Sequence, residues 1–422
     1  MQSYHEQVDT LGAYPRHAAD AVREAMTDTP VVIIQGARQV GKSTLASILT
    51  GTSTDVISVT LDDPAVLAVA QSDPAFFVKQ AGSGMLVIDE AQRAPGLILP
   101  LKASVDRDRR PGRFLLIGSA DLLHVKGVGD SLAGRAETIG LLPLSQGEMA
   151  RRATPEDFVN WVTSGAPGTV FPALEPSSVV RGGYPEAVRR SPSRAARWFA
   201  AYVDRLADHD ARDLQQGGYS DHLQVLLELV AAGGQSELVK AKLARTIGVS
   251  ENTVEAYVRL ATTMRLLTVL PPWTRSPRGR IARRPKVGLN DTGLSAQLTG
   301  FTTAHAQTLG GREYYGALTE QFVVLELRKQ AAWSQERFQL FHYRDHDGLA
   351  VDIIAELPDG HLVAIAVKSS QTVTDKSWSA LERFRSHHMD RKVTGVVLHG
   401  GTQVAHLHGW IHVLPISSLW EH

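Results

Sequence analysis

The chain has 422 residues, more than the ~250–300 that a single hydrophobic core usually supports, so we expect two or three domains. Hydrophobic residues make up 43% of the sequence and charged residues 21%, a balance that excludes a disordered chain. Lysine plus arginine equals aspartate plus glutamate at 44 each, so net charge does not draw the whole molecule to nucleic acid or to an anionic membrane. Any such attraction must come from a local patch.

The lack of cysteine excludes disulfides, thiolate metal sites and cysteine nucleophiles. The first residues, MQSYHEQVDTLGAY, carry acids and lack the apolar segment of a secretory signal. No stretch approaches the ~18 uninterrupted apolar residues that a membrane-spanning helix needs. We therefore expect a cytoplasmic protein without a membrane partner.

Four short apolar runs between residues 30 and 144 alternate with helix-like segments, which is typical of buried parallel strands in an α/β domain. The runs are VVIIQG at 31–36, VISVTL at 56–61, MLVIDE at 85–90 and FLLIGS at 114–119. The pattern predicts a wound parallel sheet, and we assign residues 1–145 to this first domain.

The first run leads into Gly36-Ala-Arg-Gln-Val-Gly41-Lys42-Ser43, which fits the phosphate-binding pattern G-x4-G-K-[ST] and opens a helix-like segment. Glycines let main-chain N–H groups close around phosphates, and the helix N-terminus favours negative charge. Lys42 is expected to reach the β- and γ-phosphates, and the Ser43 hydroxyl to hold Mg²⁺. A glycine-rich turn without a ligand is the alternative. The predicted nucleotide-binding residues are Gly36, Ala37, Arg38, Gln39, Val40, Gly41, Lys42, Ser43 and Thr44.

The run at 85–90 ends in two carboxylates, Asp89 and Glu90, which is a Walker-B pattern. Asp89 is expected to bind magnesium through its water shell, and Glu90 to orient and deprotonate the attacking water. An apolar strand that ends in Asp-Glu is common in proteins of any function. Combined with the phosphate-binding loop, it predicts binding of ATP or GTP with Mg²⁺ and hydrolysis, with ATP as the expected nucleotide.

Two further residues are catalytic candidates. Ser119 ends the fourth run and would sense the γ-phosphate or the attacking water; a strand-end turn serine is the alternative. Arg135 is a candidate arginine finger or sensor, because phosphoryl transfer gains from a cation placed on the developing charge, with a solvated surface arginine as the alternative. As a finger in trans, Arg135 would require a homo-oligomer; as a sensor in cis, it would not.

The rest of the chain separates into three segments. Residues 146–218 are rich in helix-compatible residues and predict a helical connector. Residues 219–310 begin with amphipathic helices and continue into a basic, proline-broken stretch. From residue 311 we expect a helix (REYYGALTEQFVVLELRKQ), the strands FQLFHYR, AVDIIAEL and HLVAIAVKS, another helix and a last strand, VTGVVLHG.

At this point the sequence resembles a family of bacterial and archaeal AAA-type ATPases with a C-terminal domain of unknown function that has a PD-(D/E)xK restriction-endonuclease-like core. The resemblance covers nearly the whole chain. It implies a P-loop ATPase domain, a winged-helix segment over 219–310 and a nuclease-like α/β domain over 311–422. It rests on ARQVGKSTL, LDDP, VIDEAQ, LIGSAD, LAGRAETIGLLPLSQGE, PPW, PKVGLNDTGL and VDII followed by AVKSS.

A helix-turn-helix is predicted within residues 238–261, where a first helix ends at Gly248 and Ser250 caps a second. A basic run without an acid until Asp291 follows and would form a wing that contacts phosphates. Glu251 and Glu255 on the second helix would repel DNA, so a lid or a protein-docking module is the alternative. The candidate DNA-binding residues are Asn252, Thr253, Arg275, Arg278, Arg280, Arg283, Arg284 and Lys286.

In the C-terminal segment, Glu320, Asp352 and Lys368 fit the pattern by which restriction-type nucleases hold Mg²⁺ and steady the nucleophile. The position that should supply a further glutamate is Ala366, so too few carboxylates remain for a hard cation. We expect a site that no longer cleaves, unless Glu356 or Gln371 substitutes for the missing ligand.

The main functional hypothesis is therefore an ATPase that couples or switches DNA engagement by its later domains. One alternative is a nucleotide-dependent regulator or scaffold that docks protein partners without DNA. Another is an ATP-dependent nuclease, which Ala366 argues against.

Overall fold

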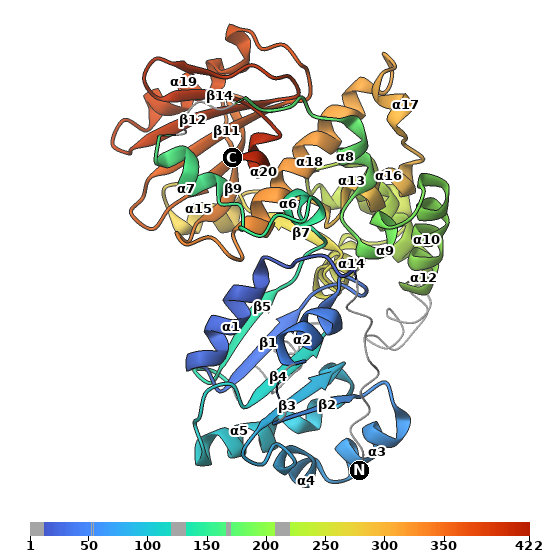
Figure 1. Ribbon diagram of the computed structural model, residues 1–422. Coiled ribbons are helices and arrows are strands. Elements are labelled where there is room, and N and C mark those ends of the chain that lie inside the picture. The colour runs from blue at the N-terminus through green and yellow to red at the C-terminus, as the bar shows by residue number, and fades with distance from the viewer. Residues whose placement is uncertain (1–11, 52, 54, 120–131, 166–169, 207–219) are drawn as a thin grey trace. The chain divides into compact units, whose positions relative to one another are not determined.

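The computed structural model describes residues 12–51, 53, 55–119, 132–165, 170–206 and 220–422 (Figure 1). The chain divides into two compact units, Met1–Pro143 with Thr263–Arg265, and Leu144–Thr262 with Leu266–His422. The division lies two residues before the boundary predicted at 145. The predicted boundary between residues 218 and 219 lies outside the described residues.

The first unit is built on a five-stranded parallel sheet with strand order β2-β3-β4-β1-β5. The four apolar runs form the first four strands, and β1 and β4 are buried at every position. The strands are β1 (Val31–Gln35), β2 (Val56–Thr60), β3 (Met85–Asp89), β4 (Phe114–Gly118) and β5 (Ala136–Gly140). The helices are α1 (Ala18–Asp28), α2 (Lys42–Thr50), α3 (Pro64–Ser72), α4 (Pro74–Lys79) and α5 (Ile98–Arg107), with short 3-10 helices η1 (Ala91–Arg93) and η2 (Pro95–Leu97) before α5.

The sheet order brings β4 between β1 and β3. Because parallel strands all end at the same edge of a sheet, the segments that follow β1, β3 and β4 meet at its carboxyl edge. On one face, side chains from α4 and α5, including Phe77 and Leu101, pack with Leu86 and Ile88 of β3 in one hydrophobic cluster. This packing fixes the strand that carries Asp89.

The second unit begins with short helices and a three-stranded antiparallel sheet of order β6-β8-β7. The helices are α6 (Gln146–Met149), α7 (Phe158–Thr163), α8 (Pro176–Arg181), α9 (Pro185–Val188), α10 (Pro192–Arg205) and α12 (Ser220–Gly233). Next come β6 (Ser236–Glu237), α13 (Lys240–Ile247), α14 (Glu251–Thr263), β7 (Leu267–Leu270), α15 (Pro277–Ala282), β8 (Lys286–Leu289), α16 (Thr292–Thr299) and α17 (Thr303–Ala306).

The same unit ends in a six-stranded mixed sheet of order β13-β14-β12-β11-β10-β9. Its elements are α18 (Arg312–Gln330), β9 (Gln339–Arg344), β10 (Ala350–Glu356), β11 (Leu362–Lys368), η5 (Asp375–Ser377), α19 (Ser379–His387), β12 (Val393–His399), β13 (Ala405–Leu407), β14 (Ile411–Pro415) and α20 (Ser418–Glu421). The long helix and the strands β9 to β12 are confirmed where the sequence predicted them. The prediction that β12 is the last strand is wrong, since β13 and β14 follow it.

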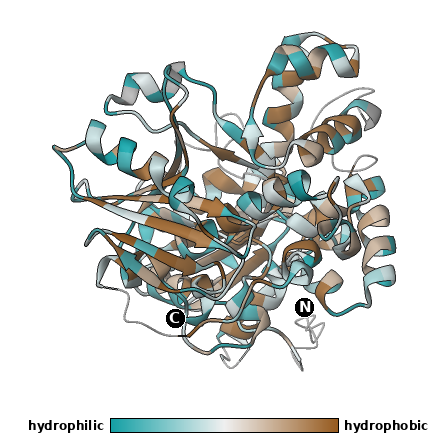
Figure 2. Ribbon diagram, turned by 90° about the horizontal axis from the view of Figure 1, so that it is seen from above, coloured by the Kyte–Doolittle hydropathy of each residue, from teal (hydrophilic) through white to brown (hydrophobic). Residues whose placement is uncertain are grey.

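Hydrophobic residues alternate along these strands between two clusters, one packed against α18 and the other against α19. Phe158 and Val162 of α7 are buried in the same cluster as Phe322 of α18. The predicted connector and C-terminal segment therefore share a core, in agreement with their place in the same compact unit. Figure 2 shows the hydrophobic residues concentrated along strands. In the part of the chain that the structure describes, no helix combines the length and apolar character needed to cross a membrane.

Candidate functional site

The loop between β1 and α2 has an unusual backbone conformation, and two of its positions favour glycine. Gly41 has φ 95° and Gln39 has φ 62°, both in the left-handed region, and Gly41 directly precedes α2. A Cβ on Gly36 would lie 2.3 Å from the carbonyl oxygen of Leu141, so a side chain does not fit there. All nine predicted nucleotide-binding residues, 36–44, lie on this loop and the first turn of α2.

The loop and the end of β3 meet through a direct hydrogen bond. The Ser43 hydroxyl lies 2.5 Å from Oδ2 of Asp89, and the other carboxylate oxygen of Asp89 accepts from the Glu90 main-chain N–H at 2.8 Å. Lys42 is buried, and its ammonium donates to the Ala37 carbonyl at 3.0 Å, so it lies over the loop. The structure thus brings together the two groups that the sequence predicted as magnesium ligands.

Glu90 belongs to a small polar network at the same edge of the sheet. The Gln92 side-chain amide donates to a carboxylate oxygen of Glu90 and, at 3.0 Å, to the Ser119 hydroxyl. The Ser119 hydroxyl in turn donates to the same Glu90 oxygen at 3.3 Å. Glu90 itself has φ 54°, an uncommon conformation for a residue with a side chain. The carboxylate that we assign to water activation is therefore held by two neighbours.

Sequence reasoning missed Gln92, although it follows the Walker-B carboxylates in VIDEAQ. Its amide contacts two of the candidate catalytic side chains, those of Glu90 and Ser119. The feature of the sequence that could have identified Gln92 is its position two residues after Glu90, which places it on the short helix η1.

Arg135 lies at the other edge of the sheet. It precedes β5, whose first residue, Ala136, pairs with Val31 at the start of β1. A five-residue strand is roughly 16 Å long, which separates Arg135 from the phosphate-binding loop of the same chain. Its guanidinium donates to Asp106 at 2.7 Å, and this hydrogen bond lowers the pKa of Asp106. The structure therefore does not bring Arg135 to that loop in the same chain, and a role as an arginine finger in trans stays a prediction.

In the second unit, the predicted helix-turn-helix has the expected local structure. Gly248 ends α13 with φ 81°, and the Ser250 hydroxyl accepts from the Thr253 main-chain N–H at 3.1 Å. Asn252 is exposed, whereas the Thr253 hydroxyl lies 2.8 Å from that of Ser250. Glu255 forms an ion pair with Lys240 at 3.0 Å. Asn252 is therefore the candidate on α14 that remains accessible.

The basic segment differs from the prediction in form and in charge. Part of it is the helix α15 rather than a β wing. Three of its cations form ion pairs: Arg275 with Asp390 at 2.9 Å, Arg280 with Glu356 at 2.7 Å, and Lys286 with Glu320 at 2.6 Å. The view of this run as uncompensated is wrong, because its acids come from distant parts of the sequence.

The other three arginines differ among themselves. Arg283 donates to the carbonyl of Arg344 at 2.5 Å. Arg278 and Arg284 are exposed, and within the described residues neither has an ion-pair partner. These two remain as candidate phosphate contacts.

The three residues predicted as a vestigial nuclease site do lie near one another. The Asp352 carboxylate accepts from the main-chain N–H of Val367, next to Lys368, at 2.8 Å. Burial raises the pKa of Glu320 to about 7, with the nearby Asp352 carboxylate adding to the rise while Lys286 opposes it. The ammonium of Lys286, on β8, thus already compensates the charge of this cluster.

Of the two candidate replacements for the missing ligand, Glu356 is already paired with Arg280, and substitution by Gln371 stays a prediction. Ala366 is buried in a hydrophobic cluster with Trp273 and Phe384, where a carboxylate would be desolvated. Glu356 is paired with Arg280, which argues against its substitution for the absent glutamate. Among the described residues, no group of three or more histidine, aspartate or glutamate side chains is arranged to hold a metal ion.

Comparison with known families agrees with the geometry of the first unit. Residues 28–150 match the family model of an AAA domain. Residues 176–305 and 315–419 match two domains of unknown function, DUF8612 and DUF4143.

Two curated relatives, uncharacterized proteins of Mycobacterium bovis and Mycobacterium tuberculosis, are each 29% identical over 357 residues, covering 85% of this chain and 74% of the relative. Among solved structures, a DNA replication initiation factor aligns with a TM-score of 0.25 at 12% identity, over 59% of this chain and 90% of that chain. A signal transduction ATPase with numerous domains from Pyrococcus horikoshii aligns with a TM-score of 0.20 at 10% identity, over 75% and 46%. Structural similarity at these scores carries no functional argument.

Proposed function

We propose that this chain, whose residues 28–150 match the family model of an AAA domain, hydrolyses ATP in a magnesium-dependent reaction at the carboxyl edge of its parallel sheet. The observation that carries the proposal is the 2.5 Å contact between Ser43 and Asp89, which unites the phosphate-binding loop with the Walker-B strand. Ser43 and Asp89 would hold Mg²⁺, which supplies charge neutralisation on the phosphates when bound.

The protein's own groups divide the remaining work. Main-chain N–H groups of residues 36–44 would surround the phosphates, and Lys42 would add a cation that neutralises negative charge on them. Glu90 would accept the proton of the attacking water, while Ser119 and Gln92 hold its carboxylate in place. This network supports the proposal that Glu90 acts as the base.

The direct test is steady-state ATP hydrolysis by the full chain with Mg²⁺, and the same assay with GTP. We expect Lys42→Ala to abolish nucleotide binding or turnover, and Glu90→Gln to retain ATP while hydrolysis falls by about 10²–10⁴-fold. Lys376→Ala and Glu336→Gln are matched controls, since both residues are exposed and lie in the second unit. Normal turnover in Lys42→Ala or Glu90→Gln would refute the assignment.

A second proposal is that nucleotide turnover switches the engagement of DNA by a winged helix formed by α13, α14 and the β7–β8 pair. Its support is the capped turn at Ser250 together with the exposed side chains of Asn252, Arg278 and Arg284. We expect duplex DNA to stimulate ATP hydrolysis. Arg278→Ala with Arg284→Ala should lower the dependence of DNA affinity on salt, whereas Arg337→Ala, at another exposed arginine, should not.

If DNA neither binds nor stimulates hydrolysis, a nucleotide-dependent regulator that docks protein partners is the better description of the second unit. DNA cleavage is not part of the proposal, because Lys286 compensates the Glu320 cluster and Ala366 replaces a ligand.

A further inference from the structure

The first unit contains a cavity of about 500 Å³ between α4 and α5, which we call the α4–α5 groove. It is lined by Ala75, Val78 and Lys79 of α4, by Leu99, Pro100, Ala103, Ser104 and Arg107 of α5, and by Asp108 and Arg113. The segments that carry nucleotide-binding residues do not contribute to its walls. The groove is therefore a surface separate from the ATPase site.

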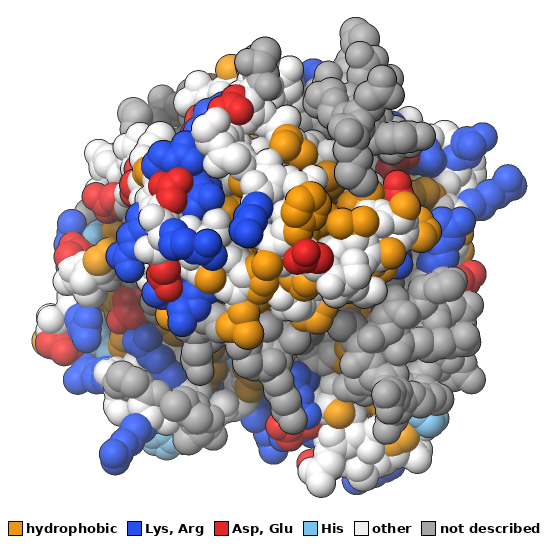
Figure 3. Space-filling model, turned by 90° about the horizontal axis from the view of Figure 1, so that it is seen from below, with side chains coloured by type: hydrophobic (Ala, Val, Ile, Leu, Met, Phe, Trp, Pro, Cys, Tyr) orange, Lys and Arg blue, Asp and Glu red, His pale blue; other side chains and the backbone are white. Residues whose placement is uncertain are grey.

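The walls are apolar, and part of that apolar surface is open to solvent. Leu99 is 64% exposed on α5, and Phe76, on the same short helix as Ala75 and Val78, is 58% exposed. On the side of the molecule shown in Figure 3, from which α4 and α5 are seen, hydrophobic side chains gather next to a group of lysine and arginine side chains. A large aliphatic side chain left in water beside a cavity is a feature of surfaces that bind apolar groups.

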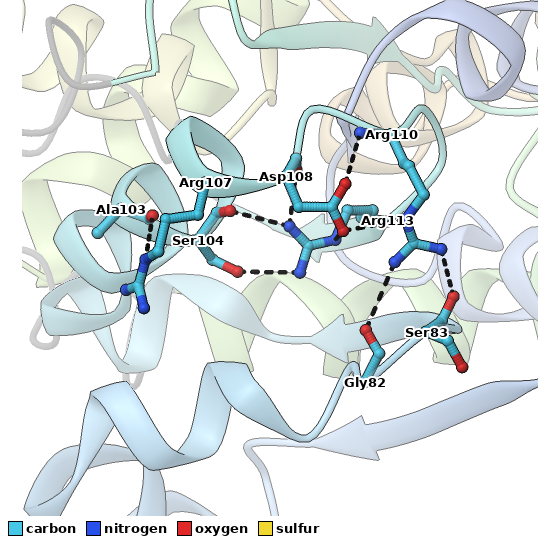
Figure 4. A network of polar contacts seen from close by, with 8 residues as sticks. All are labelled: Gly82, Ser83, Ala103, Ser104, Arg107, Asp108, Arg110 and Arg113. Carbon is cyan, nitrogen blue, oxygen red and sulfur yellow. Dashed lines mark hydrogen bonds and ion pairs between the residues drawn. The ribbon is translucent and has the colours of Figure 1, made fainter.

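The end of the groove at the C-terminus of α5 is basic and held in a fixed geometry (Figure 4). Arg113 is buried and donates to the Ser104 and Asp108 carbonyls at 2.9 and 2.8 Å. Arg110 donates to the Ser83 carbonyl at 2.5 Å and to the Asp108 carboxylate at 2.9 Å. These contacts fix the position of the guanidinium groups before any partner binds.

The charges at this end do not balance. Asp108 is shared by Arg110 at 2.9 Å and Arg113 at 3.5 Å, and hydrogen bonding to Arg110 keeps the pKa of Asp108 below its usual value. Lys79 and Arg107 line the groove, and neither has an acidic partner among the residues that the structure describes. The groove therefore combines apolar walls with an excess of positive charge at one end.

We propose that the α4–α5 groove is a docking site for an acidic amphipathic segment of a partner protein. An aliphatic side chain of that segment lies against Leu99 and Ala103, and its carboxylates meet Lys79 and Arg107. The charge of the groove selects acidic segments. Duplex DNA is a less suitable partner, because apolar walls make no favourable contact with its phosphates. The cations lie at one end of the groove, whereas DNA carries charge along its whole length.

The proposal is independent of ATP hydrolysis and is tested by binding alone. The probe is a fluorescein-labelled synthetic peptide of glutamate, alanine and leucine, with leucines at helical i, i+3, i+4 and i+7 spacing. Fluorescence anisotropy with the full chain should show saturable binding that weakens as salt is added. Leu99→Ser should lower the affinity about tenfold by removing an apolar contact, and Arg107→Glu should lower it about tenfold by reversing a charge.

Matched controls separate specific docking from general adhesion. Leu309→Ser removes a leucine that is 84% exposed in the second unit and should leave peptide affinity unchanged. A peptide with lysine in place of glutamate should not bind, and hydrogen exchange with the acidic peptide should slow in α4 and α5. The proposal is overturned if the acidic peptide does not bind saturably, if Leu99→Ser and Leu309→Ser behave alike, or if duplex DNA competes through Arg107 with higher affinity.

Discussion

Two regions of this molecule combine carboxylate and lysine side chains of the kind that bind metal ions and phosphates. They differ in the group that contacts the carboxylate. In the first unit, Asp89 meets a neutral hydroxyl, that of Ser43, at 2.5 Å. In the second unit, Glu320 meets the ammonium of Lys286 at 2.6 Å. The first arrangement leaves the carboxylate charge available to a divalent cation, whereas the second has already neutralised it.

Burial strengthens the contrast. Both members of the Lys286–Glu320 pair are mostly buried, with side-chain exposures of 17% and 21%. A buried carboxylate without a compensating charge takes up a proton or acquires an ionic partner. Because Glu320 already has Lys286 as its partner, it needs no metal ion. A hard cation would have to displace Lys286 and would find few oxygen ligands, since Ala366 supplies none. The same residue types therefore form the proposed metal site in one unit and a structural ion pair in the other.

The largest expected difference between the two regions is in ATP hydrolysis. Asp89→Asn should lower the Mg²⁺-dependent rate by about 10²–10³-fold, because it removes a charge that faces the metal. Asp352→Asn should leave the rate unchanged. Equal losses in the two variants, measured by phosphate release under the same conditions, would remove the distinction drawn here.

The next effect concerns stability. Lys286→Met should destabilise the second unit by about 2 kcal/mol at pH 8, because it leaves the Glu320 carboxylate without its partner. The double variant Lys286→Met with Glu320→Gln should recover much of this loss. All seven tryptophans, Trp161 to Trp420, lie in the second unit, so urea unfolding followed by tryptophan fluorescence reports on that unit. Additive effects in the double variant would show that the two side chains do not interact.

Gln92 offers a smaller, kinetic test of the first region. Gln92→Ala should lower kcat about tenfold with little change in KM, because Glu90 and Ser119 lose the amide that joins them. Gln71→Ala is the matched control, since the exposed Gln71 amide donates to the Arg93 carbonyl at 3.5 Å and, among the described residues, to no candidate catalytic side chain. A change in KM alone would assign Gln92 to nucleotide binding instead of to the positioning of Glu90.

The last expected effect is the dependence of stability on pH. The pKa of Glu320 is raised to about 7 from an ordinary 4.5, so the folded state holds this proton more tightly than the unfolded state. The resulting stabilisation is complete below pH 4.5 and is lost as pH rises through 7, at no more than about 1.4 kcal/mol per pH unit. Relative to Glu320→Gln, the wild type should thus lose stability between pH 5 and 7.5 in urea titrations. Parallel stability curves for the two proteins would contradict the raised pKa.

The sequence predicted local features of both regions well. The loop before α2 and the carboxylates at the end of β3 are each encoded by a short run of neighbouring residues. The helix α18 is encoded by an uninterrupted helix-compatible run. Contacts between distant segments were not predictable in this way. Lys286 and Glu320 are 34 positions apart, Arg280 and Glu356 76, and Arg275 and Asp390 115, so a locally uncompensated basic run is compensated only in the folded chain.

Arg135 illustrates the same limit within one sheet. The motif LAGR identifies the arginine as a candidate. The edge of the sheet at which it lies depends on the direction of β5 relative to β1, which the motif does not contain. Gln92 was missed for a related reason, because only the turn of η1 brings its side chain to both Glu90 and Ser119. The strands β13 and β14 have only three and five residues, too few for an alternating pattern to stand out in the sequence.

The contrast between the two regions is tested most directly by the stoichiometry of divalent cation binding, measured by electron paramagnetic resonance of Mn²⁺ with the full chain and a non-hydrolysable ATP analogue. We expect one Mn²⁺ per chain, lost in Asp89→Asn and retained in Asp352→Asn. Retention of the bound Mn²⁺ in Asp89→Asn together with its loss in Asp352→Asn would place the cation at the Glu320 cluster and contradict this interpretation.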